Sequence, residues 1–224
     1  PKWFDNVMIG TEVTFGFDTA VVTASEAIDK LHSTAEAHER VMVVEVMGRY
    51  AGWLALHSGL SGSAHAILIP EIPFDLEKVA EKIYDREAAG RNYSIIVCAE
   101  GAFPKDGTMF SEDQGKGREV LLGGIAKYVA KEISRITGKE TRSLVLGHLQ
   151  RGGSPSAFDR LLGLRFGTAA VNTLLQGKVN VMVALDPPEV KTIPIDEVIK
   201  SMKTVPMNCD TIMTARSLGV SLGD

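Results

Sequence analysis

One amphoteric and one basic side chain in a glycine-rich segment, residues 147–160, have the clearest potential for chemistry. The segment reads GHLQRGGSPSAFDR and contains His148 and Arg151. Arginine offers a fixed fork of donors that matches phosphate geometry and keeps its charge. Gly152 and Gly153 can adopt positive φ and let a ligand approach the backbone. This combination favours a site for a sugar phosphate, although an ordinary polar loop between a strand and a helix has a similar composition.

The flanking residues indicate how these side chains are positioned. The apolar run 143–146 is typical of a buried strand, and 155–175 has the pattern of a helix. Ser154 is a good N-cap and Pro155 a good first helical residue. His148 and Arg151 should therefore lie at the carboxyl end of a strand, beside a helix N-terminus. Open α/β sheets bind anionic ligands at such places.

Strand and helix patterns alternate along the rest of the chain. This alternation predicts an α/β fold with a mainly parallel sheet flanked by helices. The polar segment 105–117 is expected to be a mobile loop. Further strands are expected at 41–46, 66–69, 93–97 and 181–184, and further helices up to about residue 60, at 75–88, at 118–137 and from 195.

Composition excludes several classes of function. The chain has 224 residues, 45% hydrophobic and 23% charged, with a formal net charge of −4. Because its basic residues are dispersed, we expect no nucleic-acid partner. No apolar run approaches the ~20 residues of a membrane helix, so no membrane partner is expected. The two cysteines are too few for a disulfide framework, which favours reduced thiols and a cytoplasmic location.

Several motifs, taken in order, resemble the phosphofructokinase family. They are GTEVTFGFDTA at residues 10–20, MGRYAG at 47–52, Ala99-Glu100, Glu140-Thr141-Arg142 and the segment 147–160. The resemblance implies the fructose-phosphate half of a two-lobed fold. Residues 1–20 would be a catalytic segment from the cleft between lobes. Residues 21–224 would form the sugar-phosphate-binding region, its C-terminal part packing against an N-terminal lobe. That lobe, with its loop for nucleotide or pyrophosphate, is expected to lie outside this chain.

The resemblance also assigns roles to individual residues. Asp5 would be the base that takes the proton of the sugar 1-hydroxyl, and Arg49 would join it in catalysis. Glu100 would bind sugar hydroxyls, a role that suits a carboxylate at a strand end. The substrate-binding set would be Asn6, Met47, Gly48, Arg49, Glu100, His148 and Arg151. Arg40 and Arg142 would reach the 6-phosphate from a neighbouring subunit. From their positions alone, both could equally be solvated ends of elements.

The function implied by the resemblance is transfer of a phosphoryl group to the 1-hydroxyl of fructose 6-phosphate. The donor would be ATP or pyrophosphate, and Mg²⁺ would be held mostly by residues outside this chain, none of them assigned here. A homodimer or homotetramer is expected. Trp3 and Val7 stand where the family has threonine and a second aspartate. A catalytically impaired sugar-phosphate-binding subunit is therefore the alternative, and this chain alone should bind sugar phosphate better than it transfers phosphate.

Overall fold

The fold is built on a parallel sheet of four strands in the order β2-β3-β1-β6. The computed structural model describes residues 4–107, 111–112, 121–122 and 124–224. The sheet strands are β1 (Val41–Val46), β2 (Ala66–Leu68), β3 (Ser94–Ala99) and β6 (Thr141–Val145). This confirms the predicted mainly parallel sheet. The order of elements in the sequence explains the parallel pairing. Parallel strands need long crossover connections, and the helices between these short apolar runs supply them.

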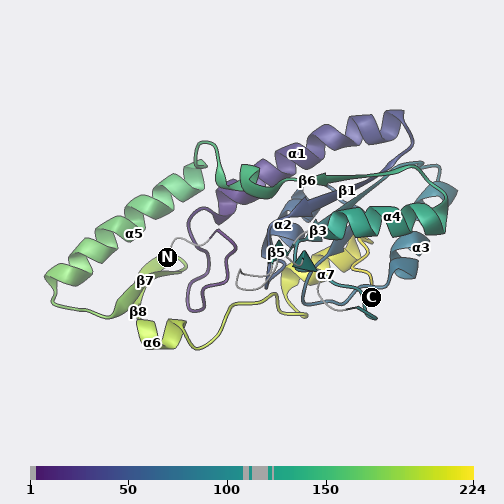
Figure 1. The fold of residues 1–224 in the computed structure, drawn as a ribbon. Helices are drawn as coiled ribbons and strands as arrows, with labels where there is room; N and C mark the ends of the chain where they lie inside the picture. Colours follow the sequence, from purple (N-terminus) through teal and green to yellow (C-terminus); the bar gives the residue numbers. More distant parts are fainter. Residues whose placement is uncertain (1–3, 108–110, 113–120, 123) are drawn as a thin grey trace.

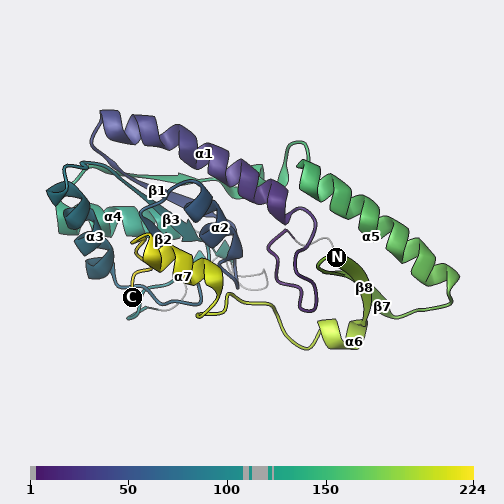
Figure 2. The same ribbon diagram turned by 180° about the vertical axis from the view of Figure 1, so that it is seen from behind.

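Helices cover both faces of the sheet (Figures 1 and 2). One face carries α1 (Phe17–Ala37), α2 (Trp53–Ser61) and α7 (Asp210–Ser217), and the other α3 (Leu76–Ala88) and α4 (Ile125–Thr137). Successive side chains of a strand point to opposite faces. Val44 of β1 accordingly packs under the first layer and Val43 under the second, both with 0% exposure. The inner strands β1, β2 and β3 are mostly apolar because both of their faces are covered, whereas the edge strand β6 is largely exposed and carries polar residues.

A separate arm extends from the sheet and is formed by residues 157–198 (Figure 1). It consists of α5 (Ala157–Leu175), the antiparallel hairpin of β7 (Val181–Asp186) and β8 (Glu189–Pro194), and the short α6 (Ile195–Val198). Its inner side packs through Leu162, Phe166 and Leu185. The outer face of α5 exposes many apolar side chains: Phe158, Leu161, Leu164, Val171, Leu174 and Leu175.

Several predicted boundaries were wrong, each for a local reason. Helix α5 begins after Ser156, not Ser154, because the Ser156 hydroxyl accepts a hydrogen bond from the amide of Asp159 at 3.2 Å. Helix α4 begins at Ile125 rather than 118, since Gly124 has φ of +84° and breaks the helical path. The strand β5 (Leu121–Leu122), paired with β4 (Ser111–Glu112), lies where that helix was expected to start.

Other elements had not been predicted at all. Helix α1, strand β8 and the 3₁₀ helix η1 (Gly147–Arg151) are present, and β3 and β7 each run two residues beyond the expected end. The buried strand expected at 143–146 instead spans Thr141–Val145 and is largely exposed, because β6 lies at the edge of the sheet. Much of the loop expected at 105–117 lies outside the described residues. Among the helices that are described, none combines the length and apolarity needed to cross a membrane.

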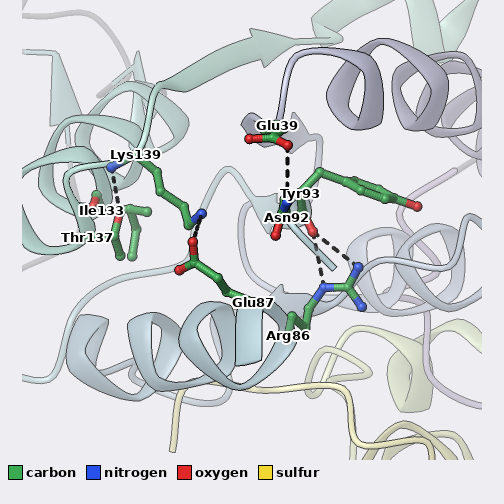
Figure 3. Close-up of polar contacts among 8 residues, drawn as sticks. All are labelled: Glu39, Arg86, Glu87, Asn92, Tyr93, Ile133, Thr137 and Lys139. Carbon is green, nitrogen blue, oxygen red and sulfur yellow. Dashed lines mark hydrogen bonds and ion pairs between the residues drawn. The ribbon is translucent and has the colours of Figure 1, made fainter. Parts of the chain in front are cut away.

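Polar contacts close the amino-terminal edge of the sheet, opposite the ends where ligands are expected (Figure 3). The Lys139 ammonium, just before β6, binds the Glu87 carboxylate of α3 at 2.8 Å. Asn92, before β3, donates to Glu39 after α1 at 3.1 Å. Arg86 donates twice to the carbonyl of Tyr93, at 3.2 and 3.1 Å. These contacts hold the turns between helices and strands, so the loops at the opposite edge extend from a fixed base.

Candidate functional site

The site forms where β1, β3 and β6 end at one edge of the sheet. In the parallel register, Val46 lies opposite Ala99, and Glu45 opposite Val145. The next residues of all three strands therefore emerge side by side. They begin the loops that contain Arg49, Glu100 and His148.

The loop after β1 is packed too tightly for ordinary side chains at two glycines. Gly48 has φ of +138°, and a Cβ there would lie 2.8 Å from the carbonyl oxygen of Ala51. A Cβ on Gly101 would lie 2.0 Å from the carbonyl oxygen of Arg49. The amide of Gly101 also donates to the carbonyl of Gly48 at 3.1 Å. This close backbone contact holds the Arg49 loop against the end of β3.

The pKa of Glu100 reflects its surroundings at this edge. Burial is the largest cause that raises its pKa above the ordinary value, and the negative charges of Asp5 and Glu45 raise it further. The Arg49 guanidinium and a backbone hydrogen bond from Gly48 act in the opposite direction. Mutual influence of this kind requires proximity. Asp5, Gly48, Arg49 and Glu100 are thus gathered into one cluster.

The segment that carries Asp5 is anchored by its neighbours. Asn6 has φ of +56° and is 4% exposed, and its Oδ1 accepts a hydrogen bond from the amide of Thr14 at 3.1 Å. The side-chain oxygen of Asn6 is therefore used in a hydrogen bond within the fold. Val7, also buried, packs in the apolar core beneath α1. Between Phe4 and Asn6, Asp5 is only partly buried.

Helix η1 carries His148 and Arg151 at the end of β6. Both are exposed, and the Arg151 guanidinium lies 4.9 Å from the centre of the Phe4 ring. Gln150 between them is buried; its Oε1 accepts from the amide of Met47 at 3.3 Å and its Nε2 donates to the carbonyl of Gly147 at 3.1 Å. A cavity of about 440 Å³ opens here, lined by Phe4, Phe15, Gly16, Thr19, Gln150, Arg151, Gly152, Gly153 and Pro155.

Asp159 ties the start of α5 to the start of α1. One carboxylate oxygen accepts from the amide of Gly16 at 2.7 Å, and the other from the amide of Thr19 at 2.8 Å and its hydroxyl at 2.5 Å. A carboxylate at a helix N-terminus satisfies free amides and interacts favourably with the helix dipole. In return, the hydroxyl of Ser156 donates to Asp18 at 2.5 Å. These contacts fix the glycine-rich loop over the cavity.

Arg40 and Arg142 lie together but away from this edge. They flank the amino-terminal starts of β1 and β6, and both bind Oε1 of Glu140, at 3.0 and 2.6 Å. The two guanidinium groups lower the pKa of Glu140 through these hydrogen bonds. Nε of Arg40 is buried and has no hydrogen-bond partner among the described residues. Arg142 also lines an open groove of about 690 Å³ between α4 and β6, together with Lys127 and Lys131.

Gln150 and Asp159 hold the site but were not predicted as site residues. A signal for Asp159 was present, because Ser156 and Asp159 have the spacing of a capping box. Its actual partner, the start of α1, is distant in sequence and could not be inferred. Gln150 carried no local signal, since its role depends on the neighbouring loop at Met47. The sequence therefore pointed to the chemistry-bearing side chains better than to those that position them.

The described residues do not by themselves form a magnesium site. Within the described ranges, no group of three or more His, Cys, Asp or Glu side chains is arranged to hold a metal ion. Mg²⁺ prefers an octahedral set of oxygen ligands. The cluster around Asp5 and Glu100 does not supply such a set.

Fold and site together define an open-sheet α/β protein with charged side chains at the carboxyl edge of its parallel sheet, the edge at which such folds bind ligands. The family model described as phosphofructokinase matches residues 1–174. The chain belongs to the phosphofructokinase family. It is 51% identical over all 224 residues to an ATP-dependent 6-phosphofructokinase of Chloroflexus aggregans, of which it covers 62%. It is 52% identical over 208 residues, 92% of the chain, to a pyrophosphate–fructose 6-phosphate 1-phosphotransferase of Streptomyces coelicolor, of which it covers 60%.

Solved structures of the same family have the same fold. A pyrophosphate-dependent phosphofructokinase from Marinobacter aquaeolei superimposes with a TM-score of 0.79 at 26% identity, covering 99% of this chain and 55% of that one. Phosphofructokinase from Saccharomyces cerevisiae gives a TM-score of 0.76 at 32% identity, covering 88% and 26%. The chain spans about 62% of the length of the first curated relatives it matches.

The raised pKa of Glu100 predicts a pH-dependent cost in stability. Because its folded-state pKa lies above the unfolded value, stability is lost as pH rises between the two, and the loss is complete above the folded value. Glu100→Gln should therefore raise Tm at pH 7. The gain should disappear below pH ~4, where Glu100 is protonated in both states. Thermal melts from pH 3 to 8 test this, with the exposed Glu26→Gln as control. A lower Tm for Glu100→Gln at pH 7 would contradict the electrostatic description.

Proposed function

We propose that the protein containing this chain transfers a phosphoryl group to the 1-hydroxyl of fructose 6-phosphate, giving fructose 1,6-bisphosphate. The observation that carries this proposal is the cluster of Asp5, Arg49 and Glu100 at the carboxyl edge of the sheet. Relatives named as ATP-dependent and as pyrophosphate-dependent enzymes are almost equally similar. They support the reaction, and either ATP or pyrophosphate as donor.

Sugar binding is assigned to the loops that end β1 and β3. The ionised Glu100 accepts hydrogen bonds from sugar hydroxyls, and Met47 and Gly48 form the wall beside it. His148 and Arg151 close the pocket from η1. Because Asn6 uses its side-chain oxygen to bind Thr14, its contribution is to hold the turn after Asp5.

Asp5 is assigned the role of general base. Its carboxylate accepts the proton of the 1-hydroxyl while that oxygen forms a bond to the terminal phosphorus of the donor. The bond from that phosphorus to the bridging oxygen breaks, and ADP or phosphate leaves. Arg49 and Arg151 offset negative charge on the transferring group, since electrostatic stabilisation supplies most of the catalysis in phosphoryl transfer.

Arg40 and Arg142 are assigned to the pocket of a second copy of the chain. Within one copy, they lie at the opposite end of β1 from Arg49, and a strand of six residues is roughly 20 Å long. Both bind the same oxygen of Glu140, so the two guanidinium groups lie close enough to contact one anion. A homodimer or homotetramer with shared substrate sites is therefore part of the proposal.

The remaining organisation follows from the same proposal. Residues 1–20 act as the catalytic segment and 21–224 as the sugar-phosphate-binding region, whose C-terminal part contacts further polypeptide. The exposed apolar face of α5 supports such a contact. When bound, Mg²⁺ would neutralise donor phosphates. The proposal includes a cytoplasmic location and a role in glycolysis, where fructose 6-phosphate is available.

One observation favours a second candidate, a sugar-phosphate-binding subunit with little transfer activity. Val7 stands where the family resemblance leads one to expect an aspartate, and its side chain is 7% exposed in the apolar core. A carboxylate there would be costly to bury. The local fold has therefore adapted to an apolar residue beside the proposed base.

Replacing Asp5 separates binding from catalysis and tests the function. Asp5→Asn should lower kcat by about 10²–10⁴-fold because asparagine cannot accept the proton. Affinity for fructose 6-phosphate should be retained, since loss of the Asp5 charge favours ionised Glu100. Calorimetry gives the affinity, and a coupled assay with ATP or pyrophosphate gives kcat; the exposed Asp29→Asn is the control. Normal kcat in Asp5→Asn would exclude the base role, and binding without turnover in wild type would support the second candidate.

Mixed oligomers test the shared site. Arg142→Ala should weaken fructose 6-phosphate binding by about 1.5–3 kcal/mol, the value of a lost charge-assisted contact. Chains carrying Arg142→Ala keep their own His148, so pairing them with His148→Ala chains should restore some complete pockets. Calorimetric titration of verified mixed oligomers measures the recovery, with Lys131→Ala as a control in the same groove. Binding by the mixture no stronger than by either parent would contradict a pocket shared between copies.

A further inference from the structure

One half-buried carboxylate, Glu71, joins the two segments that carry the proposed catalytic groups. It lies in the turn after β2. The amide of Gly52 donates to both of its oxygens, at 3.1 and 3.0 Å, and the amide of Val205 donates to Oε1 at 2.8 Å. Burial raises the pKa of Glu71, and the hydrogen bonds from Val205 and Gly52 oppose this shift by favouring the ionised form. Its partners are thus backbone groups of two different segments.

The Gly52 contact fixes the loop of Arg49. Gly52 is the N-cap residue of α2 and follows Arg49 by three positions. A Cβ on Gly52 would lie 2.3 Å from Cβ of Ile69 and 3.0 Å from Oε2 of Glu71, so only glycine permits this approach. Glu71 therefore closes one end of the loop, while Gln150 binds the amide of Met47 at the other end. A carboxylate at a helix N-terminus is also favoured by the helix dipole.

The Val205 contact leads to the segment of Asp5. Two residues before Val205, the amide of Lys203 donates to the carbonyl of Val7 at 2.8 Å. Met202 and Met8 form a β-bridge at the same place. The backbone around Lys203 therefore runs alongside the residues that follow Asp5.

A third contact joins these two branches. The indole Nε1 of Trp53, the residue after Gly52, donates to the carbonyl of Lys203 at 3.0 Å. Helix α2 and the segment 202–205 are thus held together both through Glu71 and directly. Among these contacts, the single side chain of Glu71 binds both the start of α2, at Gly52, and the segment 202–205, at Val205.

We propose that Glu71 is a positioning residue that sets the Arg49 loop relative to the Asp5 segment, acting through the amides of Gly52 and Val205. The inference rests on the proposed function, because it treats Asp5 and Arg49 as partners in one reaction. Glu71 itself does not contact the sugar. Its effect on binding must therefore pass through Arg49 and the residues beside it.

Amide hydrogen exchange measured by NMR tests the anchoring directly. In Glu71→Gln, one side-chain oxygen is replaced by an NH₂ group that cannot accept from an amide. Exchange at Gly52 and Val205 should become at least about tenfold faster, as expected for loss of a charge-assisted hydrogen bond. The exposed Glu26→Gln on α1 should leave both rates unchanged. Wild-type rates at both amides in Glu71→Gln would overturn the inference.

A double-mutant cycle on fructose 6-phosphate affinity tests whether the effect passes through Arg49. Glu71→Gln should weaken binding about tenfold in the wild-type background. In the Arg49→Ala background the same change should have less than about a twofold effect, because coupled residues are not additive. Additive losses would show a general structural role and overturn the inference. If Glu71→Gln does not fold, Glu71→Asp, which keeps the charge but shortens the reach, is used in the same cycle with the same expectation.

Different results would overturn the proposed function and the role of Glu71. Absence of fructose 6-phosphate binding by the wild-type protein would overturn the proposed function, and with it the catalytic part of this inference. Normal wild-type binding with additive losses in the cycle would overturn the role of Glu71 alone.

Discussion

The parallel pairing of β1 with β3 and β6 is the constraint on which the rest of the structure depends. It brings Val46 level with Ala99 and Glu45 level with Val145, so three loops leave the sheet at one edge. The polar and charged residues of these loops are therefore brought to the same edge by the backbone pairing itself. The same pairing places Arg40 and Arg142 together at the opposite edge. One sheet thus presents two charged regions that a single copy cannot bring to the same ligand.

Positioning at the carboxyl edge is done largely by buried or half-buried polar side chains that bind backbone amides. Gln150 connects the ends of β1 and β6, Asp159 connects α5 to α1, and Glu71 connects α2 to the segment before α7. A buried polar group is costly unless it is hydrogen-bonded, so each of these contacts fixes a geometry rather than merely adding stability. Glu100 differs from them in its neighbours: burial raises its pKa first, and the negative charges of Asp5 and Glu45 raise it further. A ligand that donates hydrogen bonds to the Glu100 carboxylate would favour its ionised form and so oppose the rise in pKa.

Sequence predicted the sheet and the strand-end location of the charged residues because both depend on local patterns. The apolar run at 41–46 and the glycines beside Arg151 are examples. What could not be predicted depended on distant partners. Helix α1 is capped by Asp159, more than 130 residues later in the chain, and Gln150 acts on a loop about 100 residues earlier. The start of α4 was also predicted wrongly. Glycine permits a positive φ but does not require it, so the conformation of Gly124 could not be inferred from the sequence.

The most direct test is a crystal structure of the protein with fructose 6-phosphate bound. We expect the sugar hydroxyls on Glu100, with the 1-hydroxyl oxygen within hydrogen-bond distance of Asp5. We also expect the 6-phosphate between Arg40 and Arg142 of a second copy. A sugar bound away from the Asp5–Glu100 cluster, or a 6-phosphate held only by arginines of the same copy, would contradict the proposed site.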